Sequence, residues 1–161
     1  MPESYHVRVA KSEHVFSAAH FITYNGRCER LHGHNYRVSA EVYGPLDENH
    51  YVIDFLVLRH KLREITTEFD QCTLLPTEHP AIRVVEDGNE VVATFGDRRW
   101  VFPRGDCRLL PIANTTAELV ASYIGQRLLS VLAEQIGIRP ARLRIELDEC
   151  DGQVAVWELG K

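Results

Sequence analysis

The stretch HGHNYRVSAEVY, residues 32–43, is the clearest β-strand signal in this sequence of 161 residues. Its side chains alternate with a period of two, as expected for a strand that buries one face. The pattern predicts a strand on which two histidines and a row of core residues share a side. That side carries His32, His34, Tyr36, Val38, Ala40 and Val42, and the other carries Arg37, Ser39, Glu41 and Tyr43.

Further strands are predicted on both sides of this one along the chain. Residues 5–14 alternate in the same way and predict a first strand. After Pro140, the segments 142–149 and 154–158 alternate again and predict a closing pair. Strands that follow one another in sequence usually lie side by side, so two hairpin-like pairs are expected.

Two amphipathic helices are predicted between these strand pairs. Asp54 is a candidate N-cap for the first helix, in which apolar residues recur at gaps of three and four. Thr115 and Glu118 match a capping box at the start of the second helix, and capping is the preferred explanation of Glu118. Gly137 is a natural end for that helix. The apolar stripes consist of Phe55, Leu58, Leu62, Ile65 and Phe69 in the first helix and Val120, Ile124, Leu128 and Val131 in the second.

A short β-meander is predicted between the helices. Three β-prone segments, 84–86, 91–95 and 100–102, are separated by Asp-Gly and Gly-Asp turns. The core order is therefore strand, strand, helix, helix, strand, strand, which favours an α+β fold of hairpins over a parallel βαβ series. We expect a single domain over residues 1–161, with an insertion at about 80–110.

Composition and charge narrow the class of protein. Lys and Arg total 18 against 23 Asp and Glu, and the net charge of −5 argues against binding nucleic acid through bulk electrostatics. No apolar run approaches the roughly 20 residues that cross a bilayer, and the N-terminal stretch is too polar for a signal peptide. We therefore expect a cytoplasmic protein. Its four cysteines are scattered without a CxxC pair, so neither a disulfide framework nor a Cys-rich zinc site is expected.

A metal site is predicted at the start of the strand quoted above. Residues two apart on a strand point the same way, so His32 and His34 converge on one side. Gly33 leaves the opposite face bare and allows another group to approach. Neutral imidazole nitrogens suit Zn²⁺, and His20, at the end of the preceding strand, is a third candidate ligand. Three histidines would leave one coordination position open, as in catalytic zinc sites.

The alternative is that the two histidines are ordinary polar residues at a strand end. The addition of His20, at a separation that fits neighbouring strands, favours zinc. The remaining histidines lack such a setting and are expected at the surface. They are His6, His14, His50, His60 and His79.

Cys28 is a candidate general base. It lies four residues before His32, and Arg27 and Arg30 flank it. A nearby zinc ion and these arginines would lower the pKa of the thiol toward neutrality. Two alternatives stay open: Cys28 is a fourth metal ligand, or it is an inert buried thiol.

Glu149 is the second residue with an unusual setting. It shares a side with Leu143 and Leu147, so its carboxylate is expected to face the apolar side, where it needs a partner. A ligand with two adjacent N–H groups would be such a partner, through a bidentate pair of hydrogen bonds. Alternatively, the strand frays or bulges before Glu149 and leaves it in a turn with Asp151-Gly152.

Together these residues resemble the 6-pyruvoyl-tetrahydropterin synthase / 6-carboxy-tetrahydropterin synthase family over nearly the whole chain, except for the predicted meander. The resemblance implies the tunnelling fold, a ββααββ antiparallel sheet with two helices on one face. The combination of CxxxHGH with an upstream AAH is its most specific part. The matching motifs are FSAAH (16–20), CERLHGH (28–34), VIDF (52–55), FDQCTLL (69–75), TTAELVASYI (115–124) and LDECDGQVAVWE (147–158).

The resemblance also implies residue roles, in which Cys28 accepts a proton and Glu149 anchors the pterin ring. The implied Zn²⁺ ligands are His20, His32 and His34; the implied catalytic residues are Cys28, Asp70 and Glu149; and the implied substrate-binding residues are Glu149 and Thr116.

The implied activity is that of a zinc-dependent lyase. It would convert 7,8-dihydroneopterin triphosphate into 6-carboxy-5,6,7,8-tetrahydropterin with release of acetaldehyde and triphosphate, for 7-deazaguanine (queuosine) synthesis. The three-residue gap between Cys28 and the HGH motif is typical of this bacterial branch of the family. Family subunits pair their sheets into a barrel and assemble as a dimer of trimers, so a homohexamer is implied.

One position departs from the family pattern. Family members have an Asp-His pair after the first helix, whose histidine relays protons, and this sequence has Asp70-Gln71. Glutamine cannot change its protonation state near neutral pH, and loss of a positioned acid–base group costs on the order of 10²–10⁴ in rate. His60, His79 or an ordered water are candidate replacements. Two alternatives follow: a diverged member that acts on another pterin or forms 6-pyruvoyl-tetrahydropterin, or a non-catalytic pterin-binding zinc protein.

Overall fold

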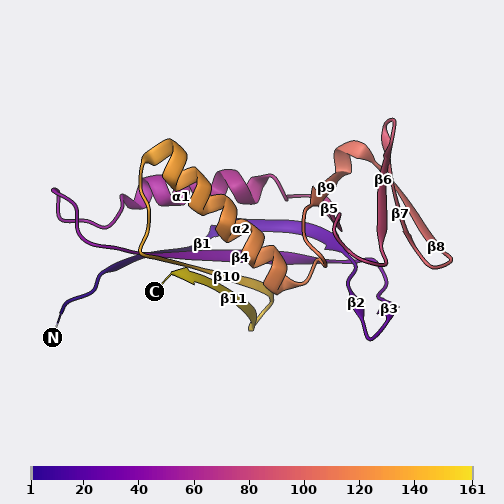
Figure 1. Ribbon diagram of the computed structural model, residues 1–161, viewed down its shortest axis with the longest axis horizontal. Coiled ribbons are helices and arrows are strands. Elements are labelled where there is room, and N and C mark those ends of the chain that lie inside the picture. The colour runs from indigo at the N-terminus through magenta and orange to yellow at the C-terminus, as the bar shows by residue number, and fades with distance from the viewer. Residues whose placement is uncertain (1, 161) are drawn as a thin grey trace.

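The computed structural model describes residues 2–160, and for residues 11–13 it describes the backbone alone. Figure 1 shows the elements along the chain. None of the helices in residues 2–160 combines the length and the apolar character that a membrane span requires. The strands are β1 (His6–His20), β2 (Thr23–Tyr24), β3 (Arg27–Cys28), β4 (His32–Tyr43), β5 (Cys72–Pro76), β6 (Arg83–Asp87), β7 (Glu90–Phe95), β8 (Arg98–Pro103), β9 (Cys107–Leu110), β10 (Arg142–Cys150) and β11 (Gln153–Gly160). The helices are α1 (Phe55–Thr67) and α2 (Ala117–Val131), with a 3₁₀ turn η1 (Arg104–Asp106) and a π-helical turn η2 (Leu132–Ile136).

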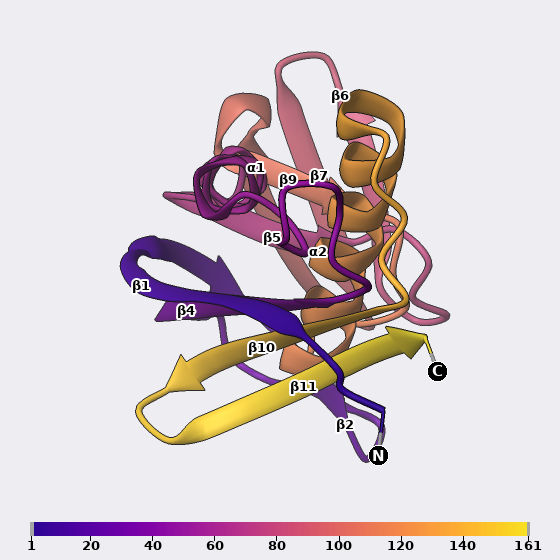
Figure 2. The ribbon, with the colours of Figure 1, turned by 90° about the vertical axis from the view of Figure 1, so that its left-hand side faces the viewer.

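The main sheet has six strands in the order β11-β10-β4-β1-β5-β9. Neighbouring strands from β11 to β1 are antiparallel. Both α-helices lie on one face of this sheet, as Figure 2 shows in a view nearly along α1. The predicted α+β order of strand, strand, helix, helix, strand, strand is confirmed.

The prediction misses two strands of the main sheet, β5 and β9. β5 pairs in parallel with β1, and β9 pairs in parallel with β5, so the antiparallel sheet has a parallel edge. All five residues of β5 are buried, which removes the alternation that marks a half-buried strand. Short buried strands of this kind leave little periodic signal in a sequence.

Most residues of the two predicted apolar stripes pack on the main sheet, but the prediction is wrong for Phe55, which is exposed, and Phe69 is buried just beyond the end of α1. Leu62 of α1 and Ile124 of α2 are fully buried members of the same core. The predicted N-cap Asp54 accepts a hydrogen bond from the backbone N–H of Leu56 at 2.7 Å. The first helix therefore begins where the sequence indicates.

The predicted capping box of α2 is wrong by one residue. Thr116 and not Thr115 is the N-cap, and its hydroxyl accepts a hydrogen bond from the N–H of Leu119 at 3.4 Å. The buried hydroxyl of Thr115 instead donates to the carbonyl oxygen of Phe21 at 3.0 Å. Glu118 is an exposed residue of the first turn, where its negative charge suits the helix dipole.

A bulge divides β1 into two halves with opposite inward faces. Ala10 pairs with Ser39 and Val15 pairs with Arg37, so five residue steps in β1 lie against two in β4. The three extra residues are an odd number, which exchanges the two faces of the strand. The buried side chains are Val7 and Val9 before the bulge and His14, Phe16, Ala18 and His20 after it.

The prediction that His14 lies at the surface is wrong for the same reason. After the bulge His14 shares a face with Phe16, and its Nε2 lies 3.3 Å from the carbonyl oxygen of Arg59 in α1. The remaining histidines of that group are His6, His50 and His60, which are exposed as predicted, and His79, which is half-buried.

The predicted meander forms a separate antiparallel sheet, β6-β7-β8, called the inserted sheet below. It stands at the end of the main sheet where β1 finishes (Figure 1). Its inward residues contribute to a second core, against which Cys28, Val84, Phe95, Trp100, Phe102 and Leu109 pack. The buried members of this second core are Phe21, Leu75, Ile82, Val91, Ala93 and Cys107.

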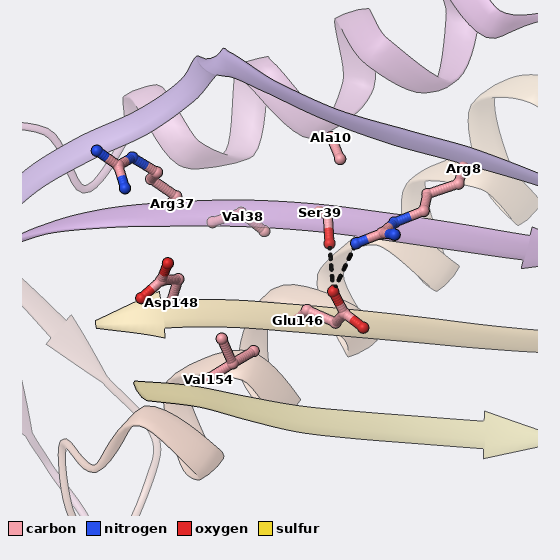
Figure 3. A pocket seen from close by; sticks show the side chains of 8 residues that line it. All are labelled: Arg8, Ala10, Arg37, Val38, Ser39, Glu146, Asp148 and Val154. Atoms are coloured by element: carbon pink, nitrogen blue, oxygen red, sulfur yellow. Dashed lines mark hydrogen bonds and ion pairs between the residues drawn. The ribbon is translucent and has the colours of Figure 1, made fainter. Parts of the chain in front are cut away.

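The face of the main sheet away from the helices is polar. Glu146 of β10 accepts hydrogen bonds from Arg8 of β1 at 2.8 Å and from Ser39 of β4 at 3.2 Å (Figure 3). These bonds join three strands on the side that neither helix covers.

We expect the substitution Gly125→Ala to destabilise the fold. An added Cβ would lie 2.1 and 2.2 Å from two ring carbons of Trp157 in β11, so α2 or the indole would have to move. The free energy of unfolding, measured by urea denaturation, should fall by about 1–3 kcal/mol. Gly105→Ala is the control, since an added Cβ there meets nothing within 4 Å. Equal stability of the Gly125→Ala and wild-type proteins would contradict this close packing.

Candidate functional site

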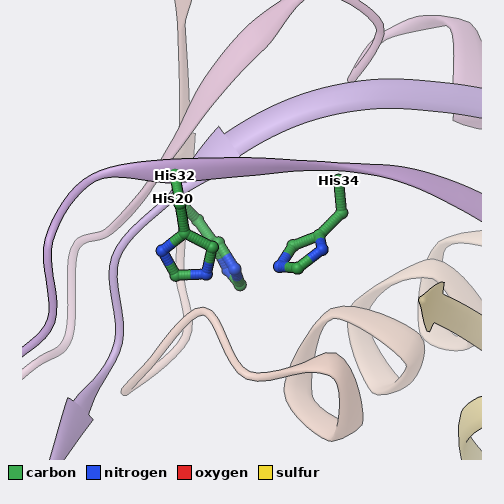
Figure 4. Close-up of side chains that lie close together, drawn as sticks. All are labelled: His20, His32 and His34. Carbon is green, nitrogen blue, oxygen red and sulfur yellow. The ribbon is translucent and has the colours of Figure 1, made fainter.

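Three histidines from adjacent strands converge at one end of the main sheet. β1 and β4 pair so that His20 lies opposite His32, and His34 follows two residues further along the same face. The ring centroids are separated by 4.7 Å (His20 and His32), 5.2 Å (His20 and His34) and 5.0 Å (His32 and His34). One ligand nitrogen from each lies within 4.8 Å of the others, and Figure 4 shows the rings pointing into the same space.

Backbone carbonyls fix the tautomers of two of these rings. Nδ1 of His20 lies 2.8 Å from the carbonyl oxygen of Thr115, and Nδ1 of His32 lies 2.8 Å from that of Arg30. Because a carbonyl oxygen only accepts, each Nδ1 carries the proton and each Nε2 keeps its lone pair. Metal-binding imidazoles are usually held in this way.

Burial favours the neutral form of His20. Its side chain is almost inaccessible, and desolvation lowers its pKa against the opposing effects of the Thr115 carbonyl and the Glu149 charge. A neutral imidazole is the form that binds a metal ion. The spacing of the three histidines, the tautomers of His20 and His32 and the burial of His20 therefore fit a divalent metal ion.

The carboxylate of Glu149 faces the same space as the histidines. Its Oε1 lies 3.5 Å from Nε2 of His20 and 3.8 Å from Nε2 of His34. The strand does bulge here, because the register of β10 with β11 shifts at this residue. Each interpretation of the sequence was right in part: β10 is irregular at Glu149, and the carboxylate still points inward.

Tyr36 is a site residue that the sequence motifs left without a role. It is fully buried on the histidine face of β4, and its hydroxyl donates to Oε1 of Glu149 at 3.3 Å. Burial raises the pKa of this phenol, with the charge of Glu149 adding to the rise, so the hydroxyl stays a donor. The available signal was the parity that Tyr36 shares with His32 and His34.

Cys28 lies in the segment that leads from β1 to β4, residues 21–31, called the cysteine loop below. Its side chain is half-buried and packs against the second core. The carbonyl oxygen of Cys28 accepts a hydrogen bond from Nη1 of Arg98 at 2.6 Å, and that of Glu29 accepts one from the same nitrogen at 3.0 Å. The inserted sheet thus contacts the cysteine loop at the thiol-bearing residue.

The prediction that Arg27 and Arg30 lower the pKa of Cys28 is wrong, because neither is among the groups that shift it. Burial raises the pKa of the thiol, and the charge of Glu29 adds to the rise. The guanidinium that acts in the opposite direction is that of Arg98. This residue is 70 positions away in sequence, so local charge patterning could not reveal it.

Asp70 and Gln71 are held away from the histidine face. Oδ1 of Asp70 accepts a hydrogen bond from the N–H of Ser17 at 2.9 Å, and the N–H of Gln71 donates to the carbonyl oxygen of Ser17 at 2.7 Å. Ser17 and its partner Asn35 carry their side chains on the opposite face of the sheet from the histidines. Gln71 lines a hollow of about 440 Å³ on that side.

Thr116 lies next to the histidine site, but its side chain is the N-cap of α2. Its hydroxyl caps α2, while the carbonyl oxygen of the preceding Thr115 binds the ring of His20. A ligand would meet Thr116 at the half-buried start of α2. Its place in a pterin pocket stays a prediction.

Fold and site together define an α+β protein with a three-histidine site suited to a metal ion. A family model described as 6-pyruvoyl tetrahydropterin synthase matches residues 9–158. The chain belongs to the 6-pyruvoyl tetrahydropterin synthase family, whose members are pterin-related lyases, and the family predicted from the motifs is confirmed.

Two archaeal relatives are similar over most of their length. A protein of Pyrococcus horikoshii is 29% identical over 136 residues, covering 83% of this chain and 79% of the relative. One from Methanocaldococcus jannaschii is 28% identical over 144 residues, covering 88% of each. Both are provisionally named 6-carboxy-5,6,7,8-tetrahydropterin synthase.

Solved structures of the family share the fold. The 6-pyruvoyltetrahydropterin synthase of Plasmodium vivax superposes with a TM-score of 0.90 at 28% identity, covering 99% of this chain and 100% of that one. The Plasmodium falciparum enzyme gives 0.89 at 31% identity with the same coverage. The Caenorhabditis elegans enzyme, with a TM-score of 0.61 and 16% identity over 98% and 97% of the two chains, shows the fold alone. The predicted tunnelling fold is confirmed.

Removal of one histidine should abolish tight binding of a divalent metal ion. We expect His34→Ala to lower the affinity for Zn²⁺ or Co²⁺ by about 100-fold or more, measured by competition with a chelator, because one of three nitrogen ligands is lost. His60→Ala is the control, since His60 is an exposed residue of α1 paired with Glu64. A His34→Ala protein that retains metal as tightly as the wild type would contradict the site.

His79, a candidate for the missing relay, is engaged at both ring nitrogens. Its Nδ1 accepts hydrogen bonds from the N–H groups of Ala81 at 2.9 Å and Ile82 at 2.8 Å. Its Nε2 therefore carries the proton, which it donates to Oγ1 of Thr23 at 2.7 Å. His79 thus anchors the start of the cysteine loop, and burial lowers its pKa.

We expect His79→Asn to reduce the acid sensitivity of the fold. Because the folded-state pKa of His79 is lowered, its contribution to stability is complete above the unfolded value of about 6.5 and is lost as pH falls through the folded value. An asparagine oxygen can accept the same N–H groups without titrating. Between about pH 7.5 and pH 5.5, the free energy of unfolding should fall less in the variant than in the wild type. Equal falls would show that His79 does not contribute.

Proposed function

We propose that this chain is a zinc-dependent lyase that converts 7,8-dihydroneopterin triphosphate into 6-carboxy-5,6,7,8-tetrahydropterin, with release of acetaldehyde and triphosphate. The observation that carries the proposal is the group of His20, His32 and His34 with the carboxylate of Glu149 beside it. Family membership and the names of the archaeal relatives support this substrate and product. The product would serve 7-deazaguanine (queuosine) synthesis in the cytoplasm.

The three histidines are the proposed holders of Zn²⁺. One ring nitrogen of each lies within 4.8 Å of the others, and backbone carbonyl groups orient the rings of His20 and His32. Bound there, the metal would supply Lewis acidity toward the hydroxyl groups of the substrate side chain. The protein supplies fixed ring orientations, which keeps the ligand nitrogens in place during the reaction.

Cys28 is the proposed proton acceptor. It belongs to the loop that joins the two histidine-bearing strands, between His20 and His32 in sequence. As a thiolate it would take a proton from the substrate side chain. Since burial raises the pKa of the thiol, its ionisation depends on positive charge nearby, and Arg98 supplies part of that charge.

Glu149 is the proposed anchor of the pterin ring. Its Oε1 is held by the hydroxyl of the buried Tyr36, which gives the carboxylate a fixed direction. In residues 2–160, its Oε2 accepts no hydrogen bond, and this oxygen would accept an N–H group of the ring. A ring held in this way keeps the reacting side chain in register with Cys28.

The working assembly is proposed to be a homohexamer, a dimer of trimers. Asp70 binds the backbone N–H of Ser17 in β1, and Gln71 lines a hollow beside Ser17 and Asn35, whose side chains lie on the opposite face of the main sheet from the histidines. A neighbouring chain that brings this face to the histidine end would complete the catalytic group with its own Asp70. Sedimentation of the purified protein would test this assembly.

The decisive experiment is turnover of 7,8-dihydroneopterin triphosphate by the zinc-loaded protein, with acetaldehyde and pterin products measured by mass spectrometry. We expect Cys28→Ala to lower kcat by about 10²–10⁴, because a positioned base is lost. Cys150→Ser, which changes an exposed thiol, is the control. Acetaldehyde formation by the wild type no faster than by Cys28→Ala would contradict the proposal.

The variant Gln71→His separates this proposal from the alternatives. If the wild type is nearly inactive on the triphosphate and the variant restores turnover, the natural protein has diverged to another pterin. A 6-pyruvoyl product would assign the other synthase reaction of the family. Pterin binding that survives Cys28→Ala, with no turnover of any dihydropterin, would indicate a binding protein.

A further inference from the structure

Arg98 joins the inserted sheet to the backbone of the cysteine loop. It opens β8, and its Nη1 donates to the carbonyl oxygens of both Cys28 and Glu29. In the described part of the chain, no other side chain donates to either carbonyl. A guanidinium bound to two successive carbonyls restrains the peptide that carries the thiol.

Arg98 is itself held by an aromatic stack. Its guanidinium lies over the indole of Trp100, 4.5 Å from the ring centroid. Trp100 in turn stacks on Phe21, with centroids 4.4 Å apart and planes 19° apart. Phe21 is the residue that follows His20. The stack thus connects the end of β1, where a histidine of the metal site lies, to the residue that bears the thiol.

The other end of the cysteine loop has separate anchors. The side chain of Asn114 accepts a hydrogen bond from the N–H of Thr23 at 3.3 Å and donates to its carbonyl oxygen at 3.2 Å, and His79 binds the Thr23 hydroxyl. β2 and β3 have only two residues each, and a ribbon this short has little stability of its own. The N–H of Glu29 donates to the carbonyl oxygen of Ile22 at 2.9 Å, but this bond lies within the cysteine loop itself. Arg98 and packing against the second core join the Cys28 side of the ribbon to the inserted sheet.

We propose that Arg98 is a positioning residue for Cys28, and that the inserted sheet serves the reaction by holding the cysteine loop against the histidine end of the sheet. The inference rests on the proposed function, in which Cys28 accepts the proton. A displacement of about 1 Å in a reacting group can cost on the order of 100-fold in rate. The positive charge of Arg98 also favours the thiolate.

The test compares Arg98→Met, Arg98→Lys and the control Arg99→Met. Methionine keeps a long side chain over Trp100 but removes both hydrogen bonds and the charge, whereas lysine keeps the charge and one donor. Arg99 is the adjacent exposed residue of the same strand, so its loss changes net charge equally. With 7,8-dihydroneopterin triphosphate, we expect kcat to fall about 10- to 100-fold in Arg98→Met and less in Arg98→Lys, while KM changes little. Arg99→Met should leave both constants near their wild-type values.

Amide hydrogen exchange gives a readout that needs no turnover. Exchange of residues 23–31 should rise in Arg98→Met and stay at the wild-type level in Arg99→Met. Alkylation of Cys107, resolved by mass spectrometry, reports the state of the second core in which it is buried. If Cys107 becomes reactive in Arg98→Met, the second core has opened in that variant. Exchange and kcat of Arg98→Lys, with Cys107 still protected, then test the proposal.

Two outcomes would overturn the proposal: unchanged exchange in residues 23–31 of Arg98→Met, or raised exchange with kcat at the wild-type value. A wild-type protein that is inactive on the triphosphate would instead refute the proposed function. The exchange of the cysteine loop would then support or overturn the holding role of Arg98 by itself.

Discussion

The pairing of β1 with β4 determines where every histidine of the site lies. His20 reaches the helix-covered face only because the bulge in β1 inserts three residues between Ala10 and Val15 and exchanges the faces of the strand. β4 runs through the same ladder without a matching irregularity, so His32 and His34 continue its core face. The two backbones approach closely there, since a Cβ at position 33 would lie 3.2 Å from a carbonyl oxygen of β1, and Gly33 accommodates this.

The sequence could predict what depends on neighbouring residues. Alternation gives the long strands, the gaps of three and four give α1, and Asp54 caps that helix through an N–H two residues away. Contacts between distant segments are not encoded locally. Thr115 is the clearest case, because its carbonyl oxygen holds the ring of His20 and its hydroxyl holds the carbonyl of Phe21. The hydroxyl of Thr115 is directed to Phe21, and the hydroxyl that caps α2 is that of Thr116.

The site lies where two cores meet. The side chain of His20 ends the row that packs under the helices, and the next residue, Phe21, is buried in the second core with the inserted sheet. The main core and the second core therefore meet at the peptide bond between His20 and Phe21. The three histidines depend on the first core, whereas the thiol of Cys28 depends on the second. Their relative position is fixed only while both cores are intact, which is a stronger requirement than either one alone imposes.

The pair Asp70-Gln71 is held in place by backbone groups of β1. Gln71 has a left-handed backbone (φ of 57°), an unfavourable conformation for a residue other than glycine. It is held by the N–H bond of Gln71 to the Ser17 carbonyl and by the bond of Asp70 to the Ser17 N–H. Neither bond uses the side chain of Gln71. A histidine at this position would therefore leave from the same backbone in the same direction. The exchange of glutamine for the expected histidine would therefore change proton chemistry and not geometry, because the backbone of β1 supplies the groups that hold this turn.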